Sequence, residues 1–304
     1  MALIDLLNSK WGTGLGTGIS SLVPPEVGYP LGTAIADLLS SLKTSPIVRA
    51  VRANQWAIHN GQLTRKQLNT LVRDTFRSSA RSLYEFWHLF RSPQTVMDMV
   101  EFEPSFMNVV HRANRGDTGT ILVSGHMANF DLIGRAMALR GLELQILSYP
   151  KPPGGYRWQN RIREIPGMRI TPMSTEALLE ASKTLRKNKV VLTNIDRPLP
   201  ASSLVNGLGK YRPRFFGHPA NMPVYYIRLA LKHHLPVTVI GGQRRPDGKY
   251  RVWAAEPIPM RPASDLIEET VQNAEAVLAV MADFIRERPE QWAMFYPVWP
   301  ETLK

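Results

Sequence analysis

Apolar residues recur at helical spacing in the first third of the chain. Between Leu68 and Phe90 they return every three or four residues, which predicts one buried face of a long helix. The sequence T-R-K-Q at Thr64 to Gln67 is typical of a capping box and starts that helix. Ser45 followed by Pro46 starts an earlier one, and the stretch from Pro30 predicts a short amphipathic or buried helix. The chain therefore begins with a helical region.

The pattern changes from about Thr118 onward, where short β-rich runs alternate with helical spacing. Such alternation favours an α/β fold with a mixed, largely parallel sheet flanked by helices. We expect one catalytic domain over residues 45–304, preceded by an apolar, Gly/Pro-rich segment, 1–44, that could contact a membrane interface. The predicted strands are T-I-L-V-S-G, L-E-L-Q-I-L-S-Y, K-V-V-L-T-N-I-D, L-P-V-T-V-I-G-G and K-Y-R-V-W-A-A, and helices are expected at 127–141, 174–187, 224–233 and 265–286.

The amino-acid composition excludes several classes of protein and of active site. The 304 residues include no cysteine, which excludes a disulfide framework, a thiolate zinc site and a cysteine nucleophile. We find no run of about 18 to 20 apolar residues that would predict a spanning helix. The first 23 residues lack a strong apolar core and a cleavage site, so we expect no signal peptide and a cytoplasmic protein.

The basic residues are concentrated in the middle of the chain. Of its 37 lysines and arginines, 20 lie between Arg140 and Arg251, together with only 6 of the 25 acidic residues. This excess indicates an anionic partner, such as phosphate groups, anionic lipid, an acidic carrier or nucleic acid. A basic surface kept for solubility is the alternative.

The strongest candidate site is S-G-H-M-A-N-F-D, from Ser124 to Asp131. His126 follows a predicted strand directly, and loops at the carboxyl ends of parallel strands are where ligands bind in such sheets. If Asp131 lies in the first turns of the next helix, its carboxylate can reach back to one imidazole nitrogen. The other nitrogen is then free to take a proton from a hydroxyl. The alternative is a histidine bound at a helix N-terminus, with Asp131 as a first-turn acid.

The chain also resembles a known family. H-M-A-N-F-D is similar to the H-x4-D/E signature of the glycerolipid acyltransferase superfamily, and the sequence from about residue 45 to the end resembles the bacterial lipid A biosynthesis (lauroyl/myristoyl) acyltransferases and the related phosphatidylinositol mannoside acyltransferases. The similar blocks follow the order of the family. They are V-R-A-N-Q-W-A-I-H-N-G, L-V-R-D-T-F-R-S-S-A-R-S-L-Y-E-F, T-N-I-D-R-P, R-P-R-F-F-G-H-P-A-N-M-P and R-P-E-Q-W-A-M-F-Y-P-V-W-P.

The resemblance implies transfer of a fatty acyl group from a thioester donor, acyl-CoA or acyl carrier protein, to a hydroxyl of a glycolipid or lipid A-like acceptor. His126 would deprotonate that hydroxyl and Asp131 would orient His126 and stabilise its charged form. No cofactor beyond the thioester co-substrate is implied. The substrate-binding residues expected with them are Ser124, Asn129, Asp196, Arg197, Arg214 and Arg228. Asp196 and Arg197 would line the same cleft, and Arg214 and Arg228 would hold a phosphate of the donor or acceptor.

Two departures from the family pattern leave the acceptor open. Val224, Tyr225 and Tyr226 stand where relatives often carry glycine and small residues, and His218 replaces another polar or acidic residue. Relatives that act on lipid A usually begin with a spanning helix, whereas this sequence predicts none. We therefore expect this chain to bind the cytoplasmic face of the cell membrane peripherally, through its apolar N-terminal segment and basic face.

Two other functions are considered. A lysophospholipid acyltransferase would share the base and the donor, but its usual F-P-E-G-like block is missing from the sequence. A non-catalytic nucleic-acid binder would explain the basic middle of the chain but not the His126 motif, and the basic region lacks interleaved aromatic residues. We therefore expect no nucleic-acid partner. The sequence has no paired-ligand spacing, so we also expect no metal.

Overall fold

A seven-stranded sheet forms the centre of the protein, which a computed structural model describes for residues 23–150, 154–199 and 208–303. Its strand order is β1-β9-β8-β2-β5-β3-β4, and every neighbouring pair is parallel except β8 and β9. The α/β class and the largely parallel sheet expected from the sequence are confirmed. The strands are β1 (Val100–Phe102), β2 (Thr120–Ser124), β3 (Leu144–Ser148), β4 (Met168–Pro172), β5 (Val190–Asn194), β8 (Val237–Arg244) and β9 (Tyr250–Ala254), with a separate small pair of β6 (Arg214–Phe215) and β7 (His218–Pro219).

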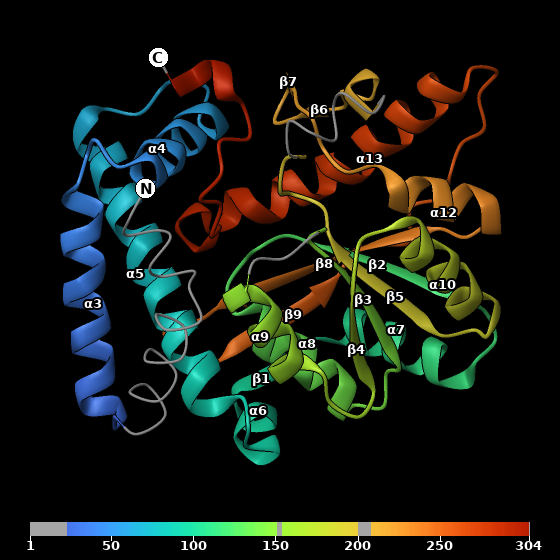
Figure 1. Ribbon diagram of the computed structural model, residues 1–304, viewed down its shortest axis with the longest axis horizontal. Helices are drawn as coiled ribbons and strands as arrows, with labels where there is room; N and C mark the ends of the chain where they lie inside the picture. Colours follow the sequence, from blue (N-terminus) through green and yellow to red (C-terminus); the bar gives the residue numbers. More distant parts are fainter. Residues whose placement is uncertain (1–22, 151–153, 200–207, 304) are drawn as a thin grey trace.

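Helices cover both faces of the sheet (Figure 1). Alternate residues of β2 divide between the two sides, because Ile121 and Val123 pack into one apolar cluster while Leu122 packs into the other. The first cluster includes α10 (Thr175–Arg186), α12 (Tyr225–His233) and α13 (Leu266–Glu287), and the second includes α7 (Pro104–Arg115) and α8 (Phe130–Leu139). Two further helices are α6 (Pro93–Met99) and α9 (Gly154–Arg163). The central strands are therefore buried on both sides, as parallel strands usually are.

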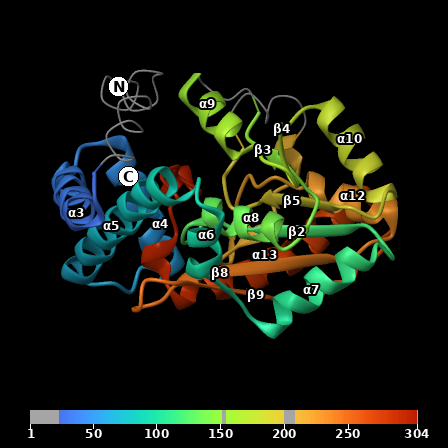
Figure 2. The same cartoon turned by 90° about the horizontal axis from the view of Figure 1, so that it is seen from below.

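The N-terminal helices stand together beside the sheet (Figures 1 and 2). They are α3 (Pro25–Ser41), α4 (Pro46–Ile58) and α5 (Arg65–Leu89), and they share a small apolar cluster of their own. Thr64 and Gln67 form the expected capping box at the start of α5. The outer side of α3 carries exposed large apolar residues at helical spacing, which we call the α3 stripe: Val27, Leu31, Ile35, Leu38 and Leu42.

The sequence located most of these elements but missed several short ones. Two of the expected helices begin with side-chain caps, since Ser174 before α10 accepts one backbone N–H group and Asp265 before α13 accepts two. The segment α6–β1–α7, α9 and β4 were not predicted; α6, β1 and β4 are short, whereas α7 is amphipathic over 12 residues and its spacing could have been recognised. Within the part of the chain that the structure describes, no helix has both the length and the apolar character needed to span a bilayer.

Candidate active site

The pairing of two central strands brings His126 and Asp196 together. Strands β2 and β5 are parallel neighbours, and Ser124 is in register with Asn194. His126 and Asp196 each follow two residues later, so both lie at the same edge of the sheet. Gly125 allows the close approach, since a Cβ atom at that position would lie 3.1 Å from Oδ2 of Asp196.

The buried carboxylate of Asp196 holds His126 at two points. Nδ1 of the ring donates to Oδ1 at 2.6 Å and the backbone N–H of His126 donates to Oδ2 at 2.7 Å. The side chain of Asp196 is fully buried, whereas that of His126 is 18% exposed. Burial acts to raise the pKa of the Asp196 carboxyl, but the charge of His126 and the hydrogen bonds outweigh burial and hold that pKa below its usual range.

A segment near the C-terminus also forms hydrogen bonds with His126 and Asp196. The indole Nε1 of the buried Trp292 donates to Oδ2 of Asp196 at 2.7 Å. The backbone N–H of Ala293 donates to the carbonyl oxygen of His126 at 2.8 Å, and Met127 forms a β-bridge with Trp292. With Nδ1 bonded to a carboxylate, Nε2 is the ring nitrogen left to accept a proton.

Nδ1 of His126 is hydrogen-bonded to Asp196 and not to Asp131. The prediction that Asp131 orients the His126 ring was therefore wrong. Asp131 lies in the first turn of α8 and pairs with Arg163 of α9. Nη2 of Arg163 donates to Oδ2 at 2.9 Å and Nε lies 2.7 Å from Oδ1. The buried Arg163 thus gives this carboxylate one hydrogen bond and a close opposite charge. The turn before α8 contains Ala128, whose φ of 50° lies in the left-handed region.

A cavity of about 270 Å³ contains His126 and Asp131 in its wall. Polar side chains at the cavity include Asn160, Arg163 and Arg197, and the remaining wall is mainly apolar. The apolar wall lies between α8 and the sheet and is built from core residues. These core residues include Ile133, Met137, Ile146, Met168, Ile170 and Leu192, and the half-buried Phe130 also lines the cavity. The ring of Phe130 meets that of His126 edge to face, with centroids 5.2 Å apart.

Three of the expected substrate-binding residues lie near this cavity. Ser124 lines it, with its hydroxyl 3.1 Å from the carbonyl oxygen of Gly125. The guanidinium of Arg197 lines it as well and stands 3.8 Å from the ring centre of Tyr149 and 3.9 Å from that of Tyr296. Asp196 lies behind His126 and acts on the ring, which differs from its expected place as a substrate ligand.

The other three lie elsewhere. Asn129 caps α8 by accepting from the N–H of Leu132, and its amide nitrogen points to Ser82 and Glu85. Its side chain is thus engaged in structural hydrogen bonds. Arg214 is exposed on β6, outside the cavity wall. Arg228 lies on α12 and lines a second, larger groove that shares Pro223 and Tyr225 with the first cavity.

Sequence reasoning missed three residues that define the site. Arg163 gave no signal because its contact with Asp131 joins residues that are 32 apart in the sequence. Trp292 belonged to the closing block of the family resemblance without any assigned role. Tyr225 lines the cavity and its hydroxyl lies 2.7 Å from that of Thr193. Burial raises the pKa of Tyr225 to about 12, so the phenol is neutral near pH 7 and can donate a hydrogen bond. Among the described residues no three His, Asp or Glu side chains gather as a metal site.

A known protein family matches this chain over nearly its whole length. The profile of the family described as bacterial lipid A biosynthesis acyltransferase matches residues 8–301, nearly the whole chain. No curated protein matches the chain at the level required for comparison. The match covers the N-terminal helices, the sheet and the C-terminal segment that carries Trp292. The chain belongs to the bacterial lipid A biosynthesis acyltransferase family.

Proposed function

We propose that this protein transfers a fatty acyl group from a thioester donor to a hydroxyl group of a lipid or glycolipid acceptor, with His126 as the general base. The observation that carries the proposal is the hydrogen bond from Nδ1 of His126 to the buried Asp196 at the wall of a largely apolar cavity. A ring held in this way presents Nε2 as a proton acceptor and gains stability when it becomes charged.

The reaction is a direct transfer. Nε2 of His126 takes the proton of the acceptor hydroxyl while that oxygen attacks the thioester carbonyl carbon. The tetrahedral intermediate then breaks its C–S bond, and the leaving thiolate takes the proton back from the imidazolium. The carboxylate of Asp196 stabilises the imidazolium between the two steps and stays ionised, consistent with its lowered pKa.

The walls of the cavity suit such substrates. An acyl chain would lie along the apolar wall between α8 and the sheet, where Met137 and Ile170 are core residues. The phenol of Tyr225 and the guanidinium of Arg197 offer hydrogen bonds at the same cavity, for the carbonyl oxygen of the donor or for an anionic group of either substrate. The ion pair of Asp131 and Arg163 holds α9 against α8 at its side.

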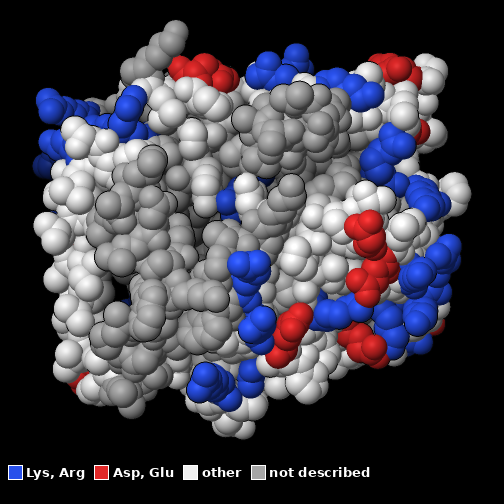
Figure 3. All heavy atoms as spheres, in the orientation of Figure 1, with Lys and Arg blue, Asp and Glu red and all other residues white. Residues whose placement is uncertain are grey.

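The protein would work at the cytoplasmic face of a membrane, bound peripherally. The α3 stripe supports this proposal, since Leu31 is 48% exposed and Leu38 is 65% exposed on the same side of one helix. On the face drawn in Figure 3, lysines and arginines gather along the right-hand side, the side of α10 and α12 in Figure 1, with acidic residues among them. The part of segment 1–44 before residue 23 lies outside the described residues.

Acyl transfer to a membrane lipid extract tests the proposal directly. We expect His126→Ala to remain folded, as judged by circular dichroism, and to lose transfer from a labelled acyl thioester by at least about two orders of magnitude. Acyl-CoA and acyl carrier protein would be compared as donors, and a lysophospholipid would be compared with the glycolipid fraction as acceptor. Transfer by His126→Ala within a few-fold of wild type would refute the role of the imidazole.

A further inference from the structure

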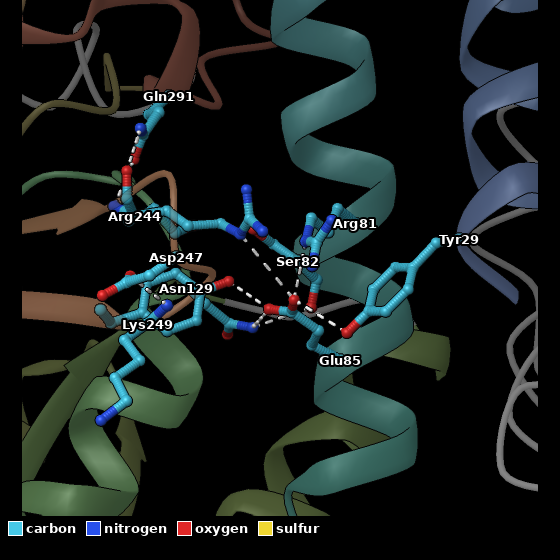
Figure 4. Close-up of polar contacts among 11 residues, drawn as sticks. Tyr29, Arg81, Ser82, Glu85, Asn129, Arg244, Asp247, Lys249 and Gln291 are labelled. Atoms are coloured by element: carbon cyan, nitrogen blue, oxygen red, sulfur yellow. Dashed lines mark hydrogen bonds and ion pairs between the residues drawn. The ribbon is translucent and has the colours of Figure 1, made fainter. Parts of the chain in front are cut away.

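A second cluster of charged residues lies apart from the His126 cavity, around the buried carboxylate of Glu85 on α5 (Figure 4). Oε1 accepts from Nε of Arg81 at 2.9 Å and from the hydroxyl of Tyr29 at 3.2 Å. Oε2 accepts from Asn129 at 3.4 Å and from the hydroxyl of Tyr250. A carboxylate offers about four lone-pair sites, so four donors satisfy this one.

Arg244 is left without an acceptor in this cluster. Its Nε lies 4.0 Å from Oε1 of Glu85, beyond hydrogen-bond reach, and this buried atom has no hydrogen-bond partner among the described residues. The backbone N–H and carbonyl of Arg244 are both bonded to the side chain of Gln291, at 2.7 and 2.9 Å, which fixes the residue at the end of β8 (Figure 4). The Arg244 side chain as a whole is 24% exposed, but its buried Nε–H has no acceptor, which is unfavourable, and an anion would satisfy it.

A cavity of about 260 Å³ adjoins this arginine, between α3, α5, the end of β8 and the segment 288–291. Its wall carries a single acidic residue among those described, Glu290, which pairs with Arg288 at 2.6 Å. Each guanidinium has five donors, and those paired with a carboxylate use one or two of them here. The cavity therefore holds many more donors than acceptors. The arginines in its wall are Arg77, Arg81, Arg244 and Arg288.

We propose that this cavity binds a phosphate group, with Arg244 as its central ligand. The flat fork of a guanidinium matches two phosphate oxygens, and Arg81 of α5 also lines the cavity and can supply a further donor. The phosphate could belong to an anionic lipid headgroup or to a soluble phosphate ester. The α3 stripe favours the headgroup, because α3 also lines the cavity with Gly28 and Gly32 and its apolar side would meet the lipid tails.

A matched pair of variants tests the site. Arg244→Gln removes the guanidinium, together with its long contact to Glu85, and leaves the backbone bonds to Gln291 in place. Arg245→Gln removes the same charge from the next residue, whose guanidinium already pairs with Glu101 and Asp247 and does not line the cavity. His126→Ala should bind like the wild type, so the failure of this site and the failure of the proposed catalysis can be told apart.

Two probes distinguish the sources of the phosphate. Flotation with phosphatidylcholine vesicles, with and without phosphatidylglycerol, reports a headgroup, and the melting temperature in inorganic phosphate or in CoA reports a soluble ester. We expect Arg244→Gln to weaken at least one of these interactions by about tenfold or more, the scale of a lost charge-assisted hydrogen bond, and Arg245→Gln to weaken it much less. Equal behaviour of the two variants with both probes would overturn the proposal.

A second variant, Gly32→Glu, tests the site independently in case Arg244→Gln does not fold. A Cβ atom at Gly32 would meet only ordinary contact, 3.9 Å from Cβ of Ala80, so Gly32→Glu places a carboxylate in the cavity wall at little steric cost. We expect it to abolish the phosphate-dependent effect while keeping the fold, as judged by circular dichroism. Unchanged phosphate or vesicle binding by a folded Gly32→Glu protein would also count against the site.

Discussion

Replacement of Asp196 by asparagine should invert the tautomer of His126. Oδ2 accepts two donors, the His126 N–H and the Trp292 indole, so the amide oxygen of asparagine must take that position. The amide NH₂ then faces Nδ1 of His126 across 2.6 Å. Two donors cannot form a hydrogen bond, and Nδ1 must become the acceptor, which moves the ring proton to Nε2. A protonated Nε2 cannot take a proton from an acceptor hydroxyl.

The magnitude follows from this loss of the base. A wrong tautomer caused by the same substitution in a serine protease triad lowers kcat by about 10⁴. We expect a fall of about 10³ to 10⁴ here, which corresponds to about 4 to 5.5 kcal/mol in the barrier at 1.36 kcal/mol for each tenfold. KM should change far less, because Asp196 is fully buried behind the ring and does not line the cavity.

The assay is initial-rate acyl transfer, combined with nitrogen NMR of the histidine ring to assign the tautomer. Asp131→Asn is the matched control, since it changes the same functional group in a carboxylate that pairs with Arg163. That variant should keep the proton on Nδ1 and lose at least about tenfold less activity than Asp196→Asn. If Asp196→Asn keeps wild-type rates, or if only Asp131→Asn changes the tautomer, the assignment of Asp196 is refuted.

Three further predictions address pH, chain length and membrane binding. Because the pKa of Asp196 is lowered on folding, this carboxylate stabilises the fold above its unfolded pKa of about 3.9, and the stabilisation is lost as pH falls through the folded pKa. The free energy of unfolding, measured by urea titration between about pH 5 and pH 3, should therefore fall more for wild type than for Asp196→Asn. Equal slopes for the two proteins would contradict this. Gly134 lines the cavity, and a Cβ atom there would lie 3.5 Å from Sδ of Met168. Gly134→Leu should therefore reduce transfer of long acyl chains more than transfer of short ones, while Gly134→Ala should not. A uniform loss across chain lengths would argue against an acyl chain in this cavity. Replacing Leu31 and Leu38 by glutamine should reduce vesicle flotation without lowering the melting temperature, since both side chains are exposed. Unchanged flotation would show that the α3 stripe does not bind the membrane.

The sequence predicted the fold well because its apolar periodicity is strong in the long elements. The helix at α5 and the strands β2 and β5 each occur where their spacing placed them. His126 was found because it follows a strand directly. Its partner was misassigned because Asp131 is near in sequence, whereas Asp196 is 70 residues away and reaches the ring only through strand pairing. Periodicity predicts which residues form a strand but not which strands become neighbours.

The packing of β2 against β5 has a consequence for how this protein could change. A displacement of one strand along the other by two residues would keep every apolar side chain on its own side, since the side-chain period is two. It would also draw His126 and Asp196 apart by about 7 Å, at 3.3 Å for each residue. Hydrophobicity alone does not forbid that arrangement. Insertions or deletions in the connections to these strands are therefore expected to silence the enzyme while leaving a folded, soluble molecule.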